Sequence, residues 1–305
     1  MGGWQIDDAP APIGRVAVIT GANSGLGYET ARALRSRGAQ VVMACRSQDK
    51  ATAAAARMAA DGPGLDPEII QLDLDDLHSV RHAAEEMTSR HESIDILINN
   101  AGVMGLRGPD GPERQLWANH LGHVALTAAL LGSIERAGGR IVSVSSNLHR
   151  RGKLRVDQPL DLIGQKPMTA YGSTKLANLL FCFEGDRRLR AARSAASFRA
   201  AHPGWSRSEL AGKGPVSDSG ALSKRVGAFV GSHFGQRTEN GAMPSLRAAL
   251  DPAIPPGAYV GPSGLGELWG PPEPVNASKA ATDPVLAAAL FDESLQWVGA
   301  SWPSP

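Results

Sequence analysis

A glycine-rich turn between a strand and a helix restricts the fold of this chain more than any other feature. Residues 15–20 are mostly apolar and β-branched, which is typical of a buried strand, and a helical pattern follows over residues 25–37. Glycines let the backbone bend sharply and approach a ligand, and a helix N-terminus presents free N–H groups and a partial positive charge. The turn therefore predicts a pyrophosphate-binding site, with a plain glycine-rich turn as the alternative. Its candidate residues are Gly21, Asn23, Ser24, Gly25, Leu26 and Gly27.

Short apolar runs and helical patterns alternate along most of the chain. Strands are predicted at residues 40–45, 68–72, 94–98, 140–145, 196–201 and 259–260, and helices at 48–60, 77–91, 113–131 and 169–190. Strands that are buried on both faces and alternate with helices form parallel sheets. We expect an α/β fold, a doubly wound parallel (Rossmann-type) sheet of about seven strands with helices on both faces.

One domain is expected over residues 15–305, after an N-terminal extension at residues 1–14. Residues 204–238 and 251–274 are rich in Gly, Ser and Pro and indicate surface loops. Loops of this length often bind substrates or close over them. We therefore place the substrate loop at residues 204–238, as an ordered lid or as a disordered loop.

The composition excludes several classes of protein. The formal net charge of +1 predicts no general attraction to nucleic acid or to an anionic membrane. No segment is apolar for the length of a membrane span, and residues 1–14 lack the features of a signal peptide, so a cytoplasmic location is expected. Cys45 and Cys182 lie in apolar runs and are expected as reduced, buried thiols, and no cysteine–histidine spacing suggests a metal site.

Candidate nucleotide contacts follow the second and third predicted strands. A carboxylate at the end of the second strand would bind the adenosine ribose and favour NAD, but Arg46 stands there instead. Its guanidinium suits a 2′-phosphate, with a solvated arginine as the alternative, so NADP(H) is expected to be preferred over NAD(H). Asp73 could accept a hydrogen bond from adenine or cap the next helix, as could Asp75 or Asp76.

Tyr171 and Lys175 form a candidate proton-transfer pair. They are four residues apart in a predicted helix, so their side chains share one face. A neighbouring ammonium lowers the pKa of a tyrosine, which favours proton exchange with a carbonyl or alcohol near neutral pH. Asn100 and Ser146 follow the fourth and fifth strands, at the sheet edge where ligands bind. These residues and the glycine turn are thus expected to meet in one crevice.

Five features, in this order, resemble the short-chain dehydrogenase/reductase family. They extend from residue 20 to about residue 208. They are Thr20-Gly21-x3-Gly25-x-Gly27, Asp73-Leu74, Asn99-Asn100-Ala101-Gly102, the Ser146/Tyr171/Lys175 set and His202-Pro203-Gly204. The resemblance implies an oxidoreductase that transfers hydride between a nicotinamide dinucleotide and a carbonyl or alcohol.

The resemblance implies catalytic roles for four residues. Tyr171 would be the general acid in reduction and the base in oxidation, and Lys175 would bind the nicotinamide ribose and lower the Tyr171 pKa. Ser146 would hydrogen-bond the substrate oxygen, with Ser145 as the alternative. Asn119 matches the family's helix asparagine, which holds a water in the proton relay, with a plain helix-surface residue as the alternative.

The resemblance also implies the remaining cofactor contacts. Asp73 and Leu74 would contact adenine, and the backbone of Asn100, Ala101 and Gly102 would line the adenosine ribose. The nicotinamide carboxamide would be approached by Pro203, Gly204, Ser206 and Ser208. Family members often carry Val or Ile at the first of these serines, so its contact would be made by the backbone.

A long insert before the tyrosine indicates a branch of the family. The interval from Ser146 to Tyr171 is longer than usual, and together with Arg46 it resembles the retinol dehydrogenase-like, or WW-domain oxidoreductase-like, branch in its bacterial type. The expected partner is a small ketone, aldehyde or alcohol that contacts Ser146, Leu148 and Trp205. A homo-oligomer is compatible with the sequence.

Two other functions are compatible with the same residues. A dinucleotide-sensing protein without turnover usually lacks the tyrosine or the lysine, and both are present here. An NADPH-dependent reductase of carbon–carbon double bonds shares the fold, and no sequence feature excludes it. Residues 149–151, His-Arg-Arg, would contact an acidic substrate or lie in a solvated loop.

Overall fold

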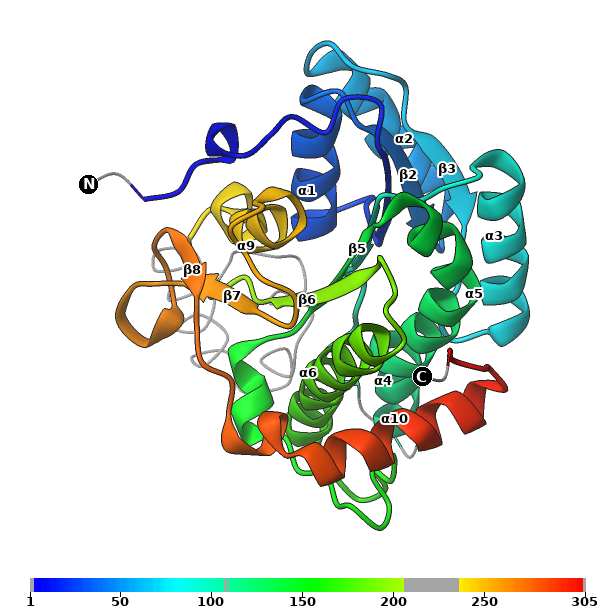
Figure 1. Cartoon of the computed structure of the whole chain (residues 1–305), viewed down its shortest axis with the longest axis vertical. Coiled ribbons are helices and arrows are strands. Elements are labelled where there is room, and N and C mark those ends of the chain that lie inside the picture. The colour runs from blue at the N-terminus through cyan, green and yellow to red at the C-terminus, as the bar shows by residue number, and fades with distance from the viewer. Residues whose placement is uncertain (1–2, 107, 109, 206–235, 304–305) are drawn as a thin grey trace.

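An eight-stranded sheet forms the centre of the computed structural model, which describes residues 3–106, 108, 110–205 and 236–303. The strand order is β3-β2-β1-β4-β5-β6-β7-β8 (Figure 1). Adjacent strands are parallel except for the β7–β8 pair. The strands are β1 (Val16–Thr20), β2 (Gln40–Cys45), β3 (Glu68–Gln71), β4 (Ile96–Asn99), β5 (Arg140–Val144), β6 (Ser197–Ala201), β7 (Tyr259–Pro262) and β8 (Pro272–Pro274).

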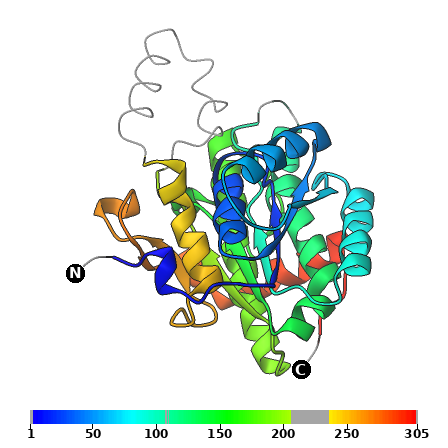
Figure 2. The same ribbon diagram turned by 90° about the horizontal axis from the view of Figure 1, so that it is seen from above.

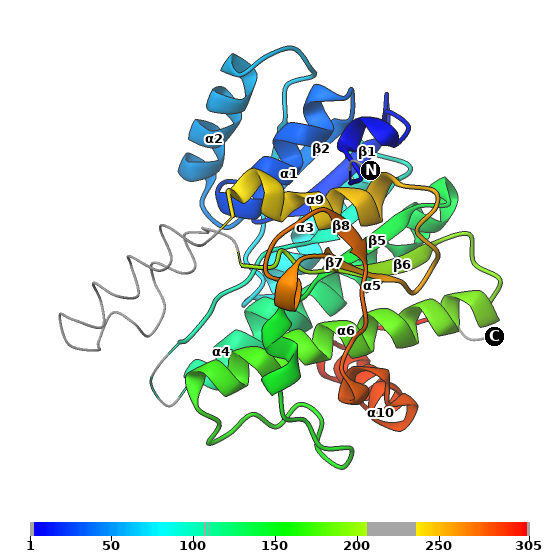
Figure 3. The same cartoon turned by 90° about the vertical axis from the view of Figure 1, so that its left-hand side faces the viewer.

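Helices cover both faces of the sheet, as Figure 3 shows. One layer holds α1 (Gly25–Ser36), α2 (Gln48–Ala60) and α9 (Thr238–Leu250). The other holds α3 (Leu77–Arg90), the short α4 (Gly111–Leu116), α5 (Gly122–Ala137) and α6 (Pro167–Ala191), with α10 (Pro284–Val298) packed against α6. The predicted α/β, doubly wound fold is confirmed.

Each central strand contributes side chains to two cores. In β1, Val18 belongs to the cluster under α3, α5 and α6, whereas Ala17 and Ile19 belong to the cluster under α1, α2 and α9. Successive side chains of a strand point to opposite faces, so a strand between two helical layers must be apolar throughout. This requirement explains the uninterrupted apolar runs in the sequence.

Four elements differ from the sequence-based expectation. The single helix expected over 113–131 consists of α4, a π-helical turn (Trp117–Leu121) and α5. Strand β8 lies at the end of the 251–274 segment, which was expected to be a surface loop, and α9, which contains Pro244, was also not expected. Helix α10 was also missed, although Asp283 caps its start and Gly299, in the left-handed region, ends it.

The N-terminal segment packs on the α9 side of the sheet (Figure 2). Trp4 is buried in that core, with the Arg247 guanidinium 5.7 Å from its ring centroid. Cys45 and Cys182 are free and buried, as expected. Among the described residues, no helix combines the length and apolar character that crossing a membrane requires.

An aromatic cluster fastens α10 to α6, the helix that carries the candidate pair. Phe291 of α10 stacks on Phe181 of α6 with ring centroids 4.9 Å apart, and Trp302 packs edge-on against Phe291 with centroids 5.2 Å apart.

We expect Phe291→Ala to lower the free energy of unfolding by about 3–5 kcal/mol, because a fully buried ring is lost. Chemical denaturation of the wild type and the variant measures this change in the free energy of unfolding. Val285→Ala, on the exposed side of the same helix, is the control and should change stability by less than about 0.5 kcal/mol.

Candidate active site

The glycine turn brings β1, the start of α1 and the end of β4 into close contact. Gly21 and Gly25 have φ angles of +68° and +55°, which favour glycine. A β-carbon on Gly27 would lie 2.5 Å from both Asn100 Nδ2 and Gly21 O, so a side chain cannot be accommodated there. Ser24 is the N-cap of α1, and among the described residues its side chain makes no capping hydrogen bond. The first N–H groups of α1 are therefore suited to a phosphate.

Thr20 joins the glycine turn to the Asn100 segment. Its Oγ1 accepts hydrogen bonds from the backbone N–H groups of Asn100 and Ala101, both at 2.9 Å. Its carbonyl accepts from Asn100 Nδ2 at 2.8 Å. His123 Nε2 lies 2.9 Å from the same hydroxyl, and burial lowers the pKa of this histidine to about 3. Sequence reasoning assigned Thr20 and His123 no role, although His123 follows Asn119 at helical spacing.

The nucleotide-side candidates lie at the ends of β2 and β3. Arg46 is exposed after β2, and its charge acts on Asp75. The helix cap is Asp76, whose Oδ1 accepts from His78 N at 2.9 Å. Asp73 Oδ1 instead accepts from Asp75 N at 3.1 Å, and Leu74 is buried against Gly122 of α5. The cap of α3 is thus Asp76 rather than Asp73.

Ser146 and Tyr171 bring the end of β5 and the start of α6 together. The Ser146 hydroxyl acts on the Tyr171 phenol in the direction that lowers its pKa, and it accepts from Leu148 N at 3.2 Å. Ser145 is buried and donates its hydroxyl to the carbonyl of Lys175 at 2.8 Å. Leu148 is half-buried, and its carbonyl packs against Gly172, beside Tyr171. The geometry thus favours Ser146 over Ser145 as the hydroxyl that faces a substrate.

Lys175 lies where three segments meet. Its Nζ donates to the carbonyl of Val144 at 3.0 Å and is 5.8 Å from the centroid of the Tyr171 ring. A β-carbon on Gly102 would lie 3.4 Å from this Nζ and 3.1 Å from Asn119 Oδ1. An ammonium has three donors. Among the described residues, the Val144 carbonyl is the one acceptor of this ammonium, and its two other donors are suited to ribose hydroxyls.

The protonation of the pair differs from the expectation. Burial raises the pKa of Tyr171 to about 12, and the neighbouring Ser146 hydroxyl opposes this shift only in part. Burial also lowers the pKa of Lys175 to about 8. The expectation that Lys175 lowers the Tyr171 pKa is therefore not met, because burial disfavours both charged forms and the ammonium is bonded to Val144.

Asn119 is fully buried in the π-helical turn, so its interpretation as a helix-surface residue is wrong. Its Oδ1 accepts from Val103 N at 2.7 Å, and its Nδ2 donates to Val103 O and to Thr174 Oγ1. Its carbonyl is 3.2 Å from His123 Nδ1. π-helical turns are frequent at functional sites, and here the turn ties the Asn100 segment to α6.

The 149–151 cluster supports Ser146. His149 Nε2 accepts from Ser278 N at 3.1 Å, so its Nδ1 carries the proton and donates to Ser146 O at 2.8 Å. Burial lowers the His149 pKa to about 4, which keeps the ring neutral. Arg150 donates to Asn276 O and pairs with Glu267, whereas Arg151 is exposed. Two of the three residues thus hold the backbone after β5.

The candidate residues that follow β6 contact the turn between β7 and β8. Gly204 has a φ of +64°. The side chain of Trp205 is 52% exposed, and its backbone N–H donates to Leu268 O at 2.8 Å. Pro203 O accepts from Gln236 Nε2 at 2.6 Å. Ser206 and Ser208, and most of the predicted substrate loop, lie outside the described residues.

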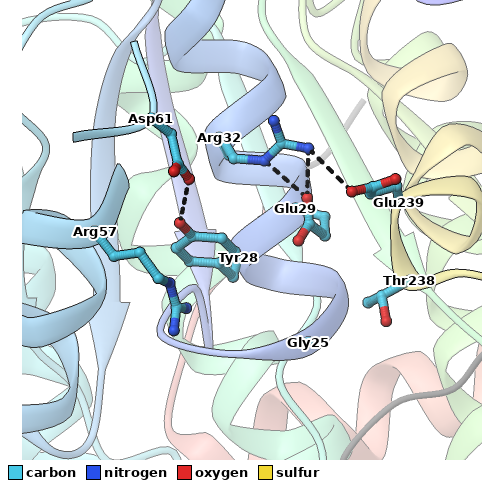
Figure 4. Close-up of a pocket in the computed structure, with 8 residues that line it drawn as sticks. All are labelled: Gly25, Tyr28, Glu29, Arg32, Arg57, Asp61, Thr238 and Glu239. Carbon is cyan, nitrogen blue, oxygen red and sulfur yellow. Dashed lines mark hydrogen bonds and ion pairs between the residues drawn. The ribbon is translucent and has the colours of Figure 1, made fainter. Parts of the chain in front are cut away.

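A separate pocket of about 660 Å³ lies between α1, α2 and α9 (Figure 4). In Figure 4, Arg32 lies between Glu29 and Glu239, and Tyr28 points to Asp61. The described lining contains neither Ser146 nor Tyr171, so we do not assign this pocket to a substrate. The lining residues are Gly25, Tyr28, Glu29, Arg32, Arg57, Asp61, Thr238 and Glu239.

Known proteins resemble this chain over most of its length. Residues 15–182 match the family model described as short chain dehydrogenase. Retinol dehydrogenase 12 of Mus musculus is 39% identical over 298 residues, which cover 95% of this chain and 88% of that protein. Retinol dehydrogenase 13 of Homo sapiens is 36% identical over 301 residues, which cover 95% of this chain and 86% of that protein.

A solved structure extends this likeness to the fold. The crystal structure of an uncharacterized protein from Mycobacterium paratuberculosis is 38% identical, has a TM-score of 0.78 and is matched over 99% of both chains. The site described above and these relatives lead to one conclusion. The chain belongs to the short-chain dehydrogenase/reductase family, is retinol dehydrogenase-like in sequence, and is an oxidoreductase that acts on CH–OH or C=O groups with NAD(P).

Proposed function

We propose that this protein interconverts a small ketone or aldehyde and the corresponding alcohol, with NADP(H) preferred over NAD(H). The observation that carries the proposal is the placement of the buried Tyr171 beside Ser146 and the buried Lys175, whose Nζ is 5.8 Å from the centroid of the Tyr171 ring. Two hydroxyls placed together can bind one carbonyl oxygen, and one of them can deliver a proton to it.

The described residues fit a dinucleotide along the carboxyl edge of the sheet. The N-terminus of α1 would hold the pyrophosphate, and Arg46 the 2′-phosphate. Asp73 and Leu74 would contact the adenine. Asn100, Ala101 and Gly102 would line the adenosine ribose, and Lys175 would bind the nicotinamide ribose. When bound, the cofactor supplies or accepts the hydride.

The chain's own groups would control the proton. With a pKa of about 12, Tyr171 keeps its proton at neutral pH and is available as a general acid for reduction. The Ser146 hydroxyl, beside the phenol, would donate to the substrate oxygen. Lys175, when protonated, would stabilise the phenolate that remains. Asn119 would hold the relay water, as proposed from the family.

The substrate-facing residues are proposed to be Ser146, Leu148 and Trp205. Retinol is part of the relatives' names, and we propose no more than a carbonyl or alcohol for this chain. The cytoplasmic location and the homo-oligomer stay predictions.

Tyr171→Phe tests the general acid. Loss of the hydroxyl should lower kcat about 10²–10⁴-fold, the range of general acid catalysis. NADPH affinity, measured by fluorescence titration, should be retained. Tyr28→Phe, which loses only the hydroxyl that bonds to Asp61, is the control and should turn over normally. Full activity of Tyr171→Phe with a panel of ketones and aldehydes would refute the assignment.

The pH profile of reduction tests Lys175. Its pKa of about 8 means that the ammonium is present below this pH and is lost above it, while Tyr171 stays protonated because its pKa is about 12. We expect kcat/KM for reduction, which reports groups of the free enzyme, to decline above about pH 8. Lys175→Arg, slower but permanently charged, should lack this decline. An identical decline in both proteins would contradict the assignment.

Arg46→Ala tests the cofactor preference. Loss of a charge-assisted contact to the 2′-phosphate should weaken NADPH binding about tenfold and leave NADH binding unchanged. The ratio of kcat/KM for the two cofactors measures this change. Arg90→Ala removes a surface arginine from α3 and is the control for a general loss of charge. If the ratio is the same in Arg46→Ala and wild type, the 2′-phosphate assignment is wrong.

A further inference from the structure

The turn between β7 and β8 is packed directly on the Pro203–Gly204 segment. A β-carbon on Gly204 would lie 2.6 Å from Leu268 O and 3.0 Å from Glu267 O, so the two backbones are in contact. Trp205 N donates to Leu268 O at 2.8 Å. This turn comes from the C-terminal part of the chain, yet it contacts the segment proposed to meet the nicotinamide.

His202 links this turn to Gly204 through its imidazole. The ring is fully buried, and its Nδ1 accepts from the backbone N–H of Gly204 at 3.3 Å. A backbone amide can only donate, so Nδ1 carries a lone pair and the ring proton is on Nε2. That Nε2 lies 3.0 Å from Glu267 Oε2. The carboxylate thus favours the tautomer that Gly204 requires.

Two further contacts restrict this histidine–glutamate pair. A β-carbon on Gly261 would lie 1.9 Å from His202 Nε2, so β7 leaves the ring no space to move in that direction. The second oxygen of Glu267 is 3.1 Å from Arg150 Nη2, which belongs to the segment after Ser146. One carboxylate therefore contacts a side chain on each side of the site.

The backbone of Glu267 is in an unfavourable conformation. Its φ of +56° lies in the left-handed region, which favours glycine and is uncommon for a glutamate. Backbone strain of this kind persists where surrounding contacts hold it, and it occurs often at functional sites. His202 and Arg150 supply such contacts, and the proximity of the His202 imidazole lowers the Glu267 pKa.

We propose that Glu267 is a positioning residue that acts through His202 on the Pro203–Gly204 turn, and so determines how tightly the nicotinamide half of the cofactor is held. The inference rests on the proposed function, together with the family resemblance that implies contact between this turn and the nicotinamide. Within the described part of the chain, the contacts of Glu267 are with Arg150, His202 and nearby backbone, and not with the residues proposed to bind the adenosine and the pyrophosphate. Loss of the Glu267 side chain should therefore weaken binding of the nicotinamide half of the cofactor and leave binding of the adenosine half unchanged.

Calorimetric titration with two probes distinguishes binding of the nicotinamide half of the cofactor from binding of its adenosine and pyrophosphate half. NADPH contains the nicotinamide, and 2′-phospho-ADP-ribose is the same molecule without it. In Glu267→Ala, the Kd for NADPH should rise about tenfold, the loss expected when one polar contact that positions the cofactor site is removed, while the Kd for 2′-phospho-ADP-ribose stays within about twofold of wild type. If wild type favours NADH, then NADH and ADP-ribose are the pair of probes.

Two further variants control for general damage. Glu267→Gln keeps an oxygen that can accept from His202 Nε2, and NADPH affinity should return to within about threefold of wild type. Glu273→Ala removes a carboxylate of the same hairpin that pairs with Arg247, and it should change neither affinity. Thermal melting shows whether each variant is folded.

The outcomes distinguish this inference from the proposed function. Equal losses of affinity for both probes in Glu267→Ala, or no loss for either, would overturn the positioning role. A wild-type protein that binds neither dinucleotide would overturn the proposed function, and the inference with it. If the wild-type protein binds the cofactor and turns over, but Glu267→Ala loses affinity for both probes equally or for neither, then only the inference is overturned.

Discussion

Lys175 and the end of β5 are joined by hydrogen bonds in both directions. The lysine ammonium donates to Val144 O at 3.0 Å, and the Ser145 hydroxyl donates to the carbonyl of Lys175 at 2.8 Å. Asn178, one turn later in α6, also donates to Val144 O. A buried ammonium without a partner would be very costly, so this arrangement fixes where α6 can lie against the sheet. The position of Tyr171 follows, because it lies one turn before Lys175 on the same helix.

The segments around Asn100, Val103 and Gly204 are held at the site by a different set of contacts. Thr20 holds the Asn100 segment against the glycine turn, and Asn119 holds Val103 against α6. The β7–β8 turn then holds Gly204 from outside. Buried polar groups of this kind are bonded almost completely in folded proteins, and each bond here joins segments that are distant in sequence. The site is therefore a product of the whole sheet edge rather than of one loop.

Much of this arrangement could be predicted from the sequence. The strand–turn–helix around Gly21 and Gly27 follows from local glycine spacing, and the convergence of Asn100 and Ser146 follows from the rule that parallel strands end at one edge. The π-helical turn could not be predicted, because residues 113–131 have an uninterrupted helical pattern. The Glu267–His202 contact was also missed, because it depends on a hairpin whose second strand contains two prolines.

The pKa values of the pair were the least predictable part of the site. Spacing alone shows that an ammonium lies near a phenol, and it predicts a lowered tyrosine pKa, but the burial of both groups has the opposite effect and is larger. The consequence is mechanistic. A phenol with a raised pKa gives up its proton only to a stronger base, and the carbonyl oxygen becomes one as hydride reaches the carbon. Proton transfer from Tyr171 would then accompany the development of negative charge on the substrate oxygen rather than precede it. Burial would thus keep the proton on Tyr171 until the reaction itself requires it.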